Sequence, residues 1–414
     1  MILNKQKLYE AAQALERSGA WDEAAETLSG AYRLALEEHD TGGIMEAVVR
    51  LAYCHSRAGK REVAREEFEA ARTMAEATGA DAIRGRALNG LGDIARIQGS
   101  LTEAERLFRM AYECGRLAGD EILLGDTAQN LGIVANIRGD LEEARLRYRA
   151  GLEHVRNGGS ERGEATVLNN LGMLHVDLGE LDAAAGYFDR ALEISSRLGD
   201  VIRAGIIHVN RAELHLAAGD LLKARNSCDE GFEIFSQVGD ILHQAEALKF
   251  YGVIYRKSGK PHLAAIHLQR AVEIAATRDP LLEAEAQREL ALVLREQGRN
   301  REALAALNRS HTLFTGLQAQ TDTADIQGRI KRLEDDFLML VQQWGESIEA
   351  KDHYTVGHCL RVADYACRLA ERVGIAPHEM VWFRMGAFLH DLGKIEVPEE
   401  VLNKPGRLTD EERA

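Results

Sequence analysis

Two histidines, an aspartate and a lysine near the C-terminus are residue types that could perform metal-assisted chemistry. The chain reads Gly357-His358 and, further on, Leu389-His390-Asp391-Leu392-Gly393-Lys394. Imidazole and carboxylate groups are ligands for Mn, Fe, Zn and similar divalent ions. Two ions bridged by a carboxylate can generate hydroxide and stabilise the leaving oxygen of a phosphodiester. Lys394 follows His390 by one helical turn, where it could meet a phosphate oxygen. Taken alone, however, each His is more often a packed or surface residue, and a bare His-Asp pair occurs by chance.

Two predicted helices must position these side chains. Residues 355–373 read as one helix, ended by Gly374. Its predicted buried side consists of Val356, Leu360, Ala363, Cys367, Ala370 and Val373. Pro377 suits the first turn of the next helix, which should end at Gly393. His358 would then lie in the first turns of one helix, and His390 and Asp391 in the last turn of the other. An antiparallel pair would bring these ends together.

The wider string around these residues closely resembles the start of an HD-GYP domain. The resemblance rests on residues 349–362 and 388–412. HD-GYP proteins are bacterial phosphodiesterases of the HD superfamily that hydrolyse cyclic di-GMP. The resemblance implies that His358, His390 and Asp391 are metal ligands, with Asp391 bridging two ions such as Fe or Mn. It also implies that Lys394 contacts substrate phosphate, so Asp391 and Lys394 are the candidate catalytic residues. Tyr354 stands where some members carry a Glu for a third ion, which favours a two-metal site.

The match covers residues 336–414, the N-terminal half of such a domain, so the sequence predicts a helical HD-type domain that is cut short. Later metal-binding residues and the Gly-Tyr-Pro loop are missing. Thr409 and Glu412 read as a capping box, yet too few residues follow to form a stable helix. We therefore expect at most one weakly held ion, little activity in this chain, and exposed apolar helix faces. A complete form is expected to be active.

A second pattern, a series of evenly spaced glycines, runs through the rest of the chain. Its members are 40 residues apart until the last step, which is 39: Gly19, Gly59, Gly99, Gly139, Gly179, Gly219, Gly259 and Gly298. Small residues recur seven positions before each glycine, and five and twelve positions after it. A fixed period of this length indicates an array of repeated units. Each glycine suits the left-handed turn that ends a first helix. Ser100 with Glu103, and Asp140 with Glu143, read as capping boxes that start second helices.

The pattern predicts eight helix-turn-helix units over residues 1–317. Small residues at matched heights would let the two helix backbones approach closely. The positions resemble the tetratricopeptide repeat, although the period exceeds that family's usual length of about 34 residues. The resemblance implies an all-α, right-handed superhelical solenoid whose concave groove binds a peptide or protein segment. Asn130, Asn170 and Asn210 stand nine residues before the glycine in three successive units and are candidate peptide-binding residues. The alternative is that these amides are solvated or bond their own loops.

A connecting segment joins the two parts. Residues 318–335 read as a polar linker and the start of a helix that runs to about residue 352. Apolar residues between 326 and 348 are spaced close to a heptad, so the helix could form a parallel homodimer with its copy. The alternative is that it packs on the last repeat and the C-terminal helices.

Composition narrows the function classes. The formal net charge of −15 disfavours nonspecific binding to nucleic acids and anionic membranes. The five cysteines form no Cys-x-x-Cys pair, which favours a reducing compartment. No apolar run is long enough to span a membrane, and the N-terminus lacks a signal-peptide core. The sequence therefore predicts a cytoplasmic protein.

Three functional hypotheses follow. The first is a repeat-regulated, metal-dependent phosphodiesterase that hydrolyses cyclic di-GMP in its complete form. The second is a protein- or peptide-binding scaffold with an inert HD remnant. The third is an HD nucleotidohydrolase acting on other phosphate esters, which explains the His-Asp doublet but not residues 395–412.

Overall fold

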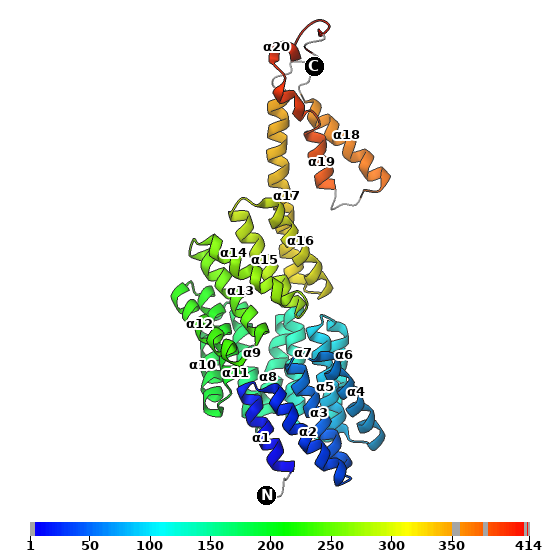
Figure 1. The fold of residues 1–414 in the computed structure, drawn as a ribbon, viewed down its shortest axis with the longest axis vertical. Coiled ribbons are helices and arrows are strands. Elements are labelled where there is room, and N and C mark those ends of the chain that lie inside the picture. The colour runs from blue at the N-terminus through cyan, green and yellow to red at the C-terminus, as the bar shows by residue number, and fades with distance from the viewer. Residues whose placement is uncertain (1–4, 350–356, 376–379, 410–411, 413–414) are drawn as a thin grey trace. The chain divides into compact units, whose positions relative to one another are not determined.

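The computed structural model describes residues 5–349, 357–375, 380–409 and 412, and every regular element in them is helical (Figure 1). The chain divides into two compact units, Met1–Ile326 and Gln327–Ala414. The predicted linker 318–335 straddles this boundary. The all-α prediction is confirmed. Tyr354, Val356 and Pro377 lie outside the described residues.

The first unit is built from eight helical hairpins. Their first helices are α1 (Lys5–Ser18), α3 (Thr41–Arg57), α5 (Asp81–Ile97), α7 (Glu121–Arg138), α9 (Glu161–Asp177), α11 (Val201–Ala217), α13 (Ile241–Lys257) and α15 (Pro280–Glu296). Their second helices are α2 (Trp21–Glu37), α4 (Arg61–Thr78), α6 (Leu101–Ala118), α8 (Leu141–Asn157), α10 (Leu181–Leu198), α12 (Leu221–Val238), α14 (Pro261–Ala275) and α16 (Asn300–Gly316). Each helix packs on the one before it and the one after it.

The turns within the hairpins are the glycine turns predicted from the sequence. All eight glycines of the series have φ between +71° and +85°, a conformation that costs glycine little. A second series with positive φ, not anticipated from the sequence, ends the second helices at Gly79, Gly119, Gly159, Gly199 and Gly239. Left-handed glycines thus close both helices of most hairpins.

Side-chain caps start many of the helices. The carboxylates of Asp40, Asp120, Asp200 and Asp240 each accept a backbone N–H at 3.0–3.2 Å at the start of a first helix. Of the two predicted capping boxes in the array, Asp140 accepts from the Glu143 N–H at 3.1 Å. The Ser100 prediction is wrong, because the Ser100 hydroxyl makes no cap bond. The Glu103 carboxylate is instead held by two hydrogen bonds from Arg106, at 2.6 and 2.8 Å.

The small residues of the repeat have two different roles. Seven positions before the turn, glycine makes room for a side chain rather than for a backbone: an aromatic ring at Gly92, Gly132 and Gly172, and Leu268 at Gly252. A Cβ on Gly172 would lie 2.6 Å from the Phe188 ring. Close backbone approach occurs at the position twelve after the turn, where a Cβ on Gly231 would lie 2.9 Å from the Gly205 carbonyl oxygen. The prediction of close backbone approach is therefore correct for glycines twelve positions after the turn and wrong for glycines seven positions before it.

Successive turns of the array touch each other. Helix α1 of the first hairpin contacts α11 of the sixth, and Arg17 Nη1 donates to the Leu198 carbonyl at 3.3 Å. The third and eighth hairpins also meet, since Thr102 Oγ1 donates to Gln318 Oε1 at 3.5 Å. The array therefore returns onto itself after five hairpins, and the first helices enclose an inner, concave surface.

Helix α17 (Gln320–Glu349) begins earlier than predicted. Gln318, with φ of +56°, ends α16, and Thr323 N–H already donates to the Ala319 carbonyl at 2.9 Å. Asp322, which the sequence places in a polar linker, forms an ion pair with Arg288 of α15. This ion pair fixes the first turn of α17 to the last hairpin. Ile326 and Leu333, two residues of the predicted dimer seam, are 0% and 3% exposed within the single chain. At these two positions the burial disfavours an exposed dimer seam, while the side chains of Phe337, Leu340, Trp344 and Ile348 lie outside the described part of the chain.

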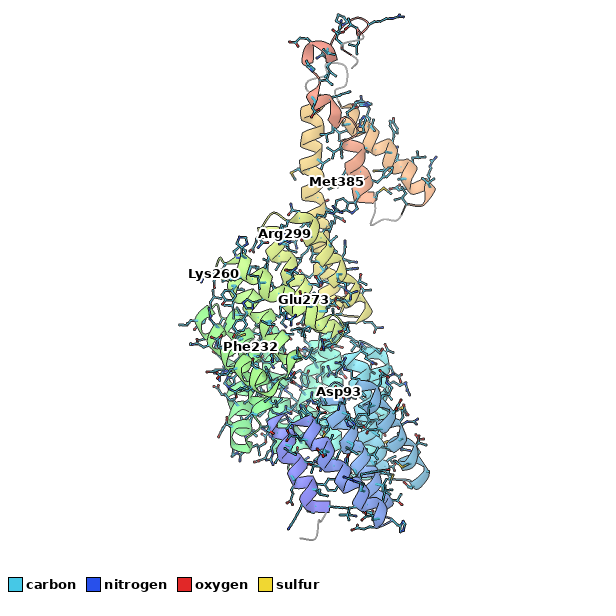
Figure 2. The ribbon with its side chains drawn as sticks, viewed as in Figure 1. Asp93, Phe232, Lys260, Glu273, Arg299 and Met385 are labelled. Carbon is cyan, nitrogen blue, oxygen red and sulfur yellow. The ribbon has the colours of Figure 1, made fainter. Side chains whose placement is uncertain are left out.

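The second unit contains α18 (His358–Val373), α19 (Met380–Phe388), the 3₁₀ helix η1 (Leu392–Glu396) and α20 (Glu399–Leu402). Its core joins the C-terminal part of α17 to α18 and α19 through Val341, Cys359, Ala363, Met385 and Phe388; Figure 2 labels Met385.

The buried side of α18 differs in part from the prediction. Ala363, Cys367 and Ala370 are buried as expected. Leu360 is 44% exposed, because Cys359 faces the core in its place, and Val373 at the end of the helix is 73% exposed.

Candidate metal centre

The two histidines predicted to bind metal come together in the second unit. His358 is the first residue of α18 and follows Gly357, whose φ is +71°. His390 follows the end of α19. The two Nε2 atoms lie 3.2 Å apart, and the ring centroids are 5.2 Å apart. Two helices that are distant in sequence thus present two imidazoles to one point.

His390 lies in a turn rather than in the last turn of a helix, so that prediction is wrong. Helix α19 ends at Phe388, five residues before Gly393, and the chain tightens into η1. The Leu392 N–H donates to the Leu389 carbonyl at 3.0 Å, a three-residue spacing. The His390 ring contributes to this turn, because its Nδ1 donates to the Ala387 carbonyl at 2.8 Å. This bond leaves Nε2 as the nitrogen that carries a lone pair toward His358.

Asp391 and Lys394 complete the cluster. Asp391 Oδ2 lies 3.3 Å from His390 Nε2 and 2.8 Å from Lys394 Nζ. The side chains of Asp391 and Lys394 are 23% and 27% exposed, so solvent and ligands can reach both. One carboxylate oxygen, Oδ2, therefore faces both the His390 imidazole and the Lys394 ammonium.

These donors fit a divalent ion. One nitrogen from each of His358 and His390 and one oxygen from Asp391 all lie within 4.8 Å of one another. Nitrogen and carboxylate donors suit Mn, Fe and Zn, and the Nδ1 bond of His390 is the kind of support that metal-bound histidines usually have. Within the described part of the chain, this is the one group of three such side chains.

The capping box predicted at the end of this unit is present. Thr409 N–H donates to Glu412 Oε2 at 2.7 Å, and Glu412 N–H donates to Thr409 Oγ1 at 3.3 Å. Lys404 Nζ also binds Glu412, at 2.6 Å.

The predicted asparagine column lies on the inner surface of the array. A cavity of about 430 Å³ is lined mainly by first helices, from α3 to α11, and Asn130 and Asn170 are on its wall. Asn210 is only 6% exposed and is not among the lining residues. The amides bond between neighbouring first helices: Asn130 Nδ2 donates to Asn89 Oδ1 at 2.9 Å, and Asn210 Nδ2 to Asn169 Oδ1 at 3.0 Å.

The sequence reasoning missed the arginines of the same cavity. Arg57, Arg96, Arg162 and Arg203 line it, together with Asp93, which Figure 2 labels, and Asp126. These arginines stand at unrelated positions of the repeat, so the 40-residue period gave no signal for them.

A second cavity of about 340 Å³ lies further along the inner surface, on α9, α11, α13 and α15. It is rich in acids, among them Glu213 and Glu285. Burial, with repulsion by neighbouring carboxylates, raises the pKa of Glu213 to about 7. Lys249 Nζ binds Glu285 Oε2 at 2.5 Å.

Comparison with known proteins assigns the repeats. A model described as tetratricopeptide repeat matches residues 43–117, 83–157, 121–197 and 203–277, more than half of the chain. The chain belongs to the tetratricopeptide repeat family. The solved structure of a Rap protein in complex with the Competence and Sporulation Factor is similar in fold. It has a TM-score of 0.54 and 15% identity, over 80% of this chain and 99% of that chain. The solved structure of the Cut9–Hcn1 assembly of APC/C is also similar in fold, with a TM-score of 0.55 and 13% identity. The match covers 79% of this chain and 55% of that chain.

An HD domain follows the repeats. The HD domain model matches residues 355–414. The 3'3'-cGAMP-specific phosphodiesterase 3 of Vibrio cholerae is 40% identical over 81 residues, 19% of this chain and 18% of the relative. The cyclic di-GMP phosphodiesterase response regulator RpfG of Xanthomonas campestris is 41% identical over 66 residues, which are 16% of this chain and 18% of the relative. The C-terminal segment is therefore homologous to the HD-GYP cyclic dinucleotide phosphodiesterases, and both predicted resemblances are confirmed. The chain spans less than a fifth of the length of these relatives.

Among the described helices, none combines the length and the apolar character that crossing a membrane requires.

Proposed function

We propose that this protein is a metal-dependent phosphodiesterase of cyclic dinucleotides, regulated by its repeat array, with cyclic di-GMP as the substrate. The observation that carries the proposal is the convergence of His358, His390 and Asp391 beside Lys394, in a segment homologous to phosphodiesterases of this class.

Each side chain of the cluster has a role in this proposal. His358, His390 and Asp391 would hold the metal, and His390 is oriented for this by its bond to the Ala387 carbonyl. Lys394 is placed to contact a phosphate oxygen, because its ammonium lies next to the carboxylate that faces the metal site. When bound, a divalent ion supplies Lewis acidity and a water of lowered pKa.

The number of donors limits the metal content. Three protein ligands are the usual set for a single catalytic ion with an open position, whereas two-ion sites need further ligands. We therefore propose that the described residues hold at most one ion, weakly, and that hydrolysis by residues 1–414 is slow.

Metal binding tests the site directly. In a Mn²⁺ titration followed by electron paramagnetic resonance, we expect close to one ion per chain. His390→Ala should weaken binding by more than about 100-fold, because it removes a ligand. His262→Ala, which changes an exposed histidine on α14, is the matched control and should have no effect. If His390→Ala binds Mn²⁺ as tightly as the unmodified chain, His390 is not a ligand and the proposed site is wrong. Two tightly held ions per chain would contradict the single-ion proposal.

Substrate binding tests the activity class. We expect the Mn²⁺-loaded chain to bind cyclic di-GMP in a calorimetric titration. Lys394→Met should lower the affinity about tenfold, the effect of losing a charge-assisted hydrogen bond to phosphate. Preference for 3'3'-cGAMP would correct the substrate, and failure of the metal-loaded chain to bind either dinucleotide would contradict the proposal.

The second candidate function is that of a peptide- or protein-binding scaffold. The inner cavities of the array favour it, since their volumes of about 340 and 430 Å³ lie within the range of ligand-binding pockets. The Rap protein of similar fold was solved in complex with the Competence and Sporulation Factor. In our proposal the two functions combine, and the ligand of the groove regulates the HD domain.

A further inference from the structure

An arginine on α18 lies at the same end of that helix as the candidate metal centre. His358 is the first residue of α18, and Arg361 follows it by three positions. Residues with this spacing are neighbours on the surface of a helix. Arg361 is exposed, so its guanidinium can meet a ligand that arrives from solvent. None of the roles assigned above to His358, His390, Asp391 and Lys394 involves it.

The Arg361 side chain turns back toward the start of the helix. Its Nη1 atom lies 3.0 Å from the position that a Cβ on Gly357 would occupy. Long side chains in helices lean in this direction, toward the N-terminus. Gly357 directly precedes His358, so the guanidinium lies at the end of α18 that presents an imidazole to the metal centre. The glycine leaves room for it there.

This end of the helix is an unfavourable place for a positive charge. The N-terminus of a helix carries a partial positive charge, and acidic side chains, not basic ones, are stabilising near it. The first turn of α18, which the structure describes in full, contains no acidic residue. A divalent ion held by His358 and His390 would add positive charge at the same end. An anionic ligand would offset all of these charges.

The substrate class proposed above carries two anionic groups. A cyclic dinucleotide contains two phosphodiester groups in one ring. Hydrolysis adds water across one P–O bond: the water oxygen goes to phosphorus, and a proton goes to the departing 3′ oxygen. The other phosphodiester stays intact and charged throughout.

One lysine does not provide for both phosphates. Lys394 Nζ lies 2.8 Å from Asp391 Oδ2, which places it beside the candidate metal ligands and therefore beside the phosphate that reacts. Arg361 belongs to the other helix of the site and lies at the start of α18, next to His358. A ligand with two phosphates could thus meet one cationic side chain from each side of the centre.

We propose that Arg361 binds the phosphodiester group that is not hydrolysed, and that it thereby selects cyclic dinucleotides over ligands with a single phosphodiester. The proposal rests on the function proposed above and adds a specificity-determining residue to it. A guanidinium can donate two parallel N–H bonds to two oxygens of one phosphate, which the ammonium of a lysine cannot do.

The experiment compares two ligands on the Mn²⁺-loaded full chain by calorimetric titration. Cyclic di-GMP has two phosphodiester groups, whereas the linear dinucleoside GpG has both guanines and a single phosphodiester. Arg361→Gln should lower the affinity for cyclic di-GMP about tenfold, the effect of losing charge-assisted hydrogen bonds, and should change the affinity for GpG by less than about twofold. Mn²⁺ affinity should stay the same, because Arg361 is not among the metal donors.

Two further variants complete the comparison. Arg361→Lys keeps the charge but loses the paired donors, so it should retain part of the affinity for cyclic di-GMP. Arg368→Gln is the matched control. Arg368 follows Arg361 by seven positions, so it lies on the same side of α18 about 10 Å further along the helix. Its side chain is 71% exposed, and this variant should bind both ligands as the unmodified chain does.

Three outcomes would overturn the proposal. Unchanged affinity of Arg361→Gln for cyclic di-GMP would show that the guanidinium does not contact this ligand. An equal loss of affinity for GpG would place Arg361 at a guanine or at the phosphate that reacts. Weakened Mn²⁺ binding would show that Arg361 supports the metal centre instead. In all three cases the unmodified chain still binds cyclic di-GMP, whereas failure of the unmodified chain to bind it would contradict the proposed function itself.

Discussion

At the scale of single residues, the array depends on glycines whose missing Cβ makes room for a ring. Gly172 on α9 faces Phe188 of α10, and the same pairing recurs between Gly92 and Phe108. Phe188 and Phe108 are fully buried, so their rings have little freedom to move. A methyl group at these glycines would have to displace the ring or the helix.

Gly172→Ala is therefore expected to destabilise the array by about 1–3 kcal/mol, the usual cost of overpacking. Gly186→Ala on α10 is the matched control, because a Cβ there meets nothing within 4 Å. This control should be neutral or stabilise by up to about 1 kcal/mol through helix propensity. Urea denaturation followed by circular dichroism measures the free energy of unfolding of both variants. Equal effects of the two substitutions would contradict the explanation that Gly172 makes room for the Phe188 ring.

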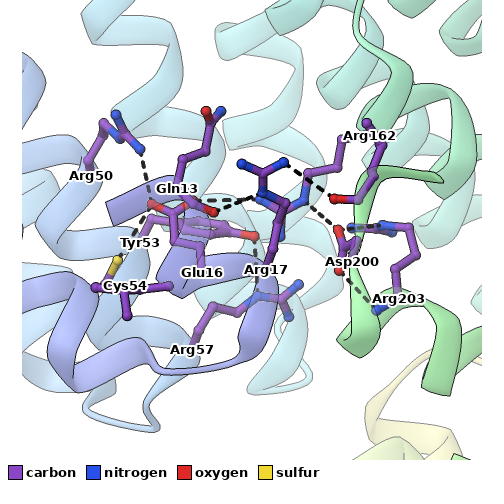
Figure 3. A network of polar contacts seen from close by, with 12 residues as sticks. Gln13, Glu16, Arg17, Arg50, Tyr53, Cys54, Arg57, Arg162, Asp200 and Arg203 are labelled. Atoms are coloured by element: carbon purple, nitrogen blue, oxygen red, sulfur yellow. Dashed lines mark hydrogen bonds and ion pairs between the residues drawn. The ribbon is translucent and has the colours of Figure 1, made fainter. Parts of the chain in front are cut away.

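At the scale of helices, Asp200 connects two elements, α9 and α11 (Figure 3). It caps α11 through the Arg203 N–H at 3.1 Å, and its carboxylate accepts from Arg162 of α9. The cap is encoded locally, as in Asp40 or Asp240, whereas the bond to Arg162 depends on the packing of one hairpin against the next.

Asp200→Ala should cost about 3–5 kcal/mol, because it leaves two largely buried arginines without their shared partner. Asp220→Ala on α12 is the control: Asp220 caps its helix at 3.0 Å but pairs only with the exposed Lys223, so about 1 kcal/mol is expected. Thermal denaturation distinguishes the two values. A cost at Asp200 no larger than that at Asp220 would show that the ion pairs contribute nothing beyond the cap.

At the scale of the whole molecule, the acidic cavity makes the stability of the array depend on pH. Glu213 faces Lys249, which favours its charge, and Glu285, Asp177 and Glu246, which oppose it. The pKa is raised from 4.5 to about 7, so between these values the folded chain binds a proton that the unfolded chain releases. This group therefore destabilises the fold above pH 7, and its cost is lost progressively as the pH falls toward 4.5.

Glu213→Gln should raise the melting temperature at pH 8 on the order of 1–3 °C and should have a smaller effect at pH 5. Glu193→Gln, on the exposed face of α10, is the control and should shift neither value. Melting curves between pH 5 and 8 give the comparison. A Glu213→Gln effect that is the same at both ends of this range would argue against a protonated carboxyl group.

The sequence by itself determined the hairpins and the composition of the candidate metal centre. Left-handed glycines at a fixed period set where each first helix ends, because few other residues adopt a φ near +80° without strain. His358, His390 and Asp391 could be named as candidate ligands because the string around them resembles an HD-GYP domain, and the structure brings the three side chains together. The asparagine column could be recognised because Asn130, Asn170 and Asn210 recur at the 40-residue period. The period did not indicate that Asn210 is buried.

Only the tertiary structure decided the rest. The tight turn at His390 depends on a ring-to-carbonyl bond to Ala387 that competes with helix continuation. The role of Gly172 depends on which side chain the facing helix presents. The convergence of Arg57 with Arg162 and Arg203 depends on the small rotation between hairpins, which adds up over several repeats before two turns of the array meet. Contacts of this kind leave no periodic trace in the chain, because each arginine is positioned by the geometry of the whole array and not by its neighbours in sequence.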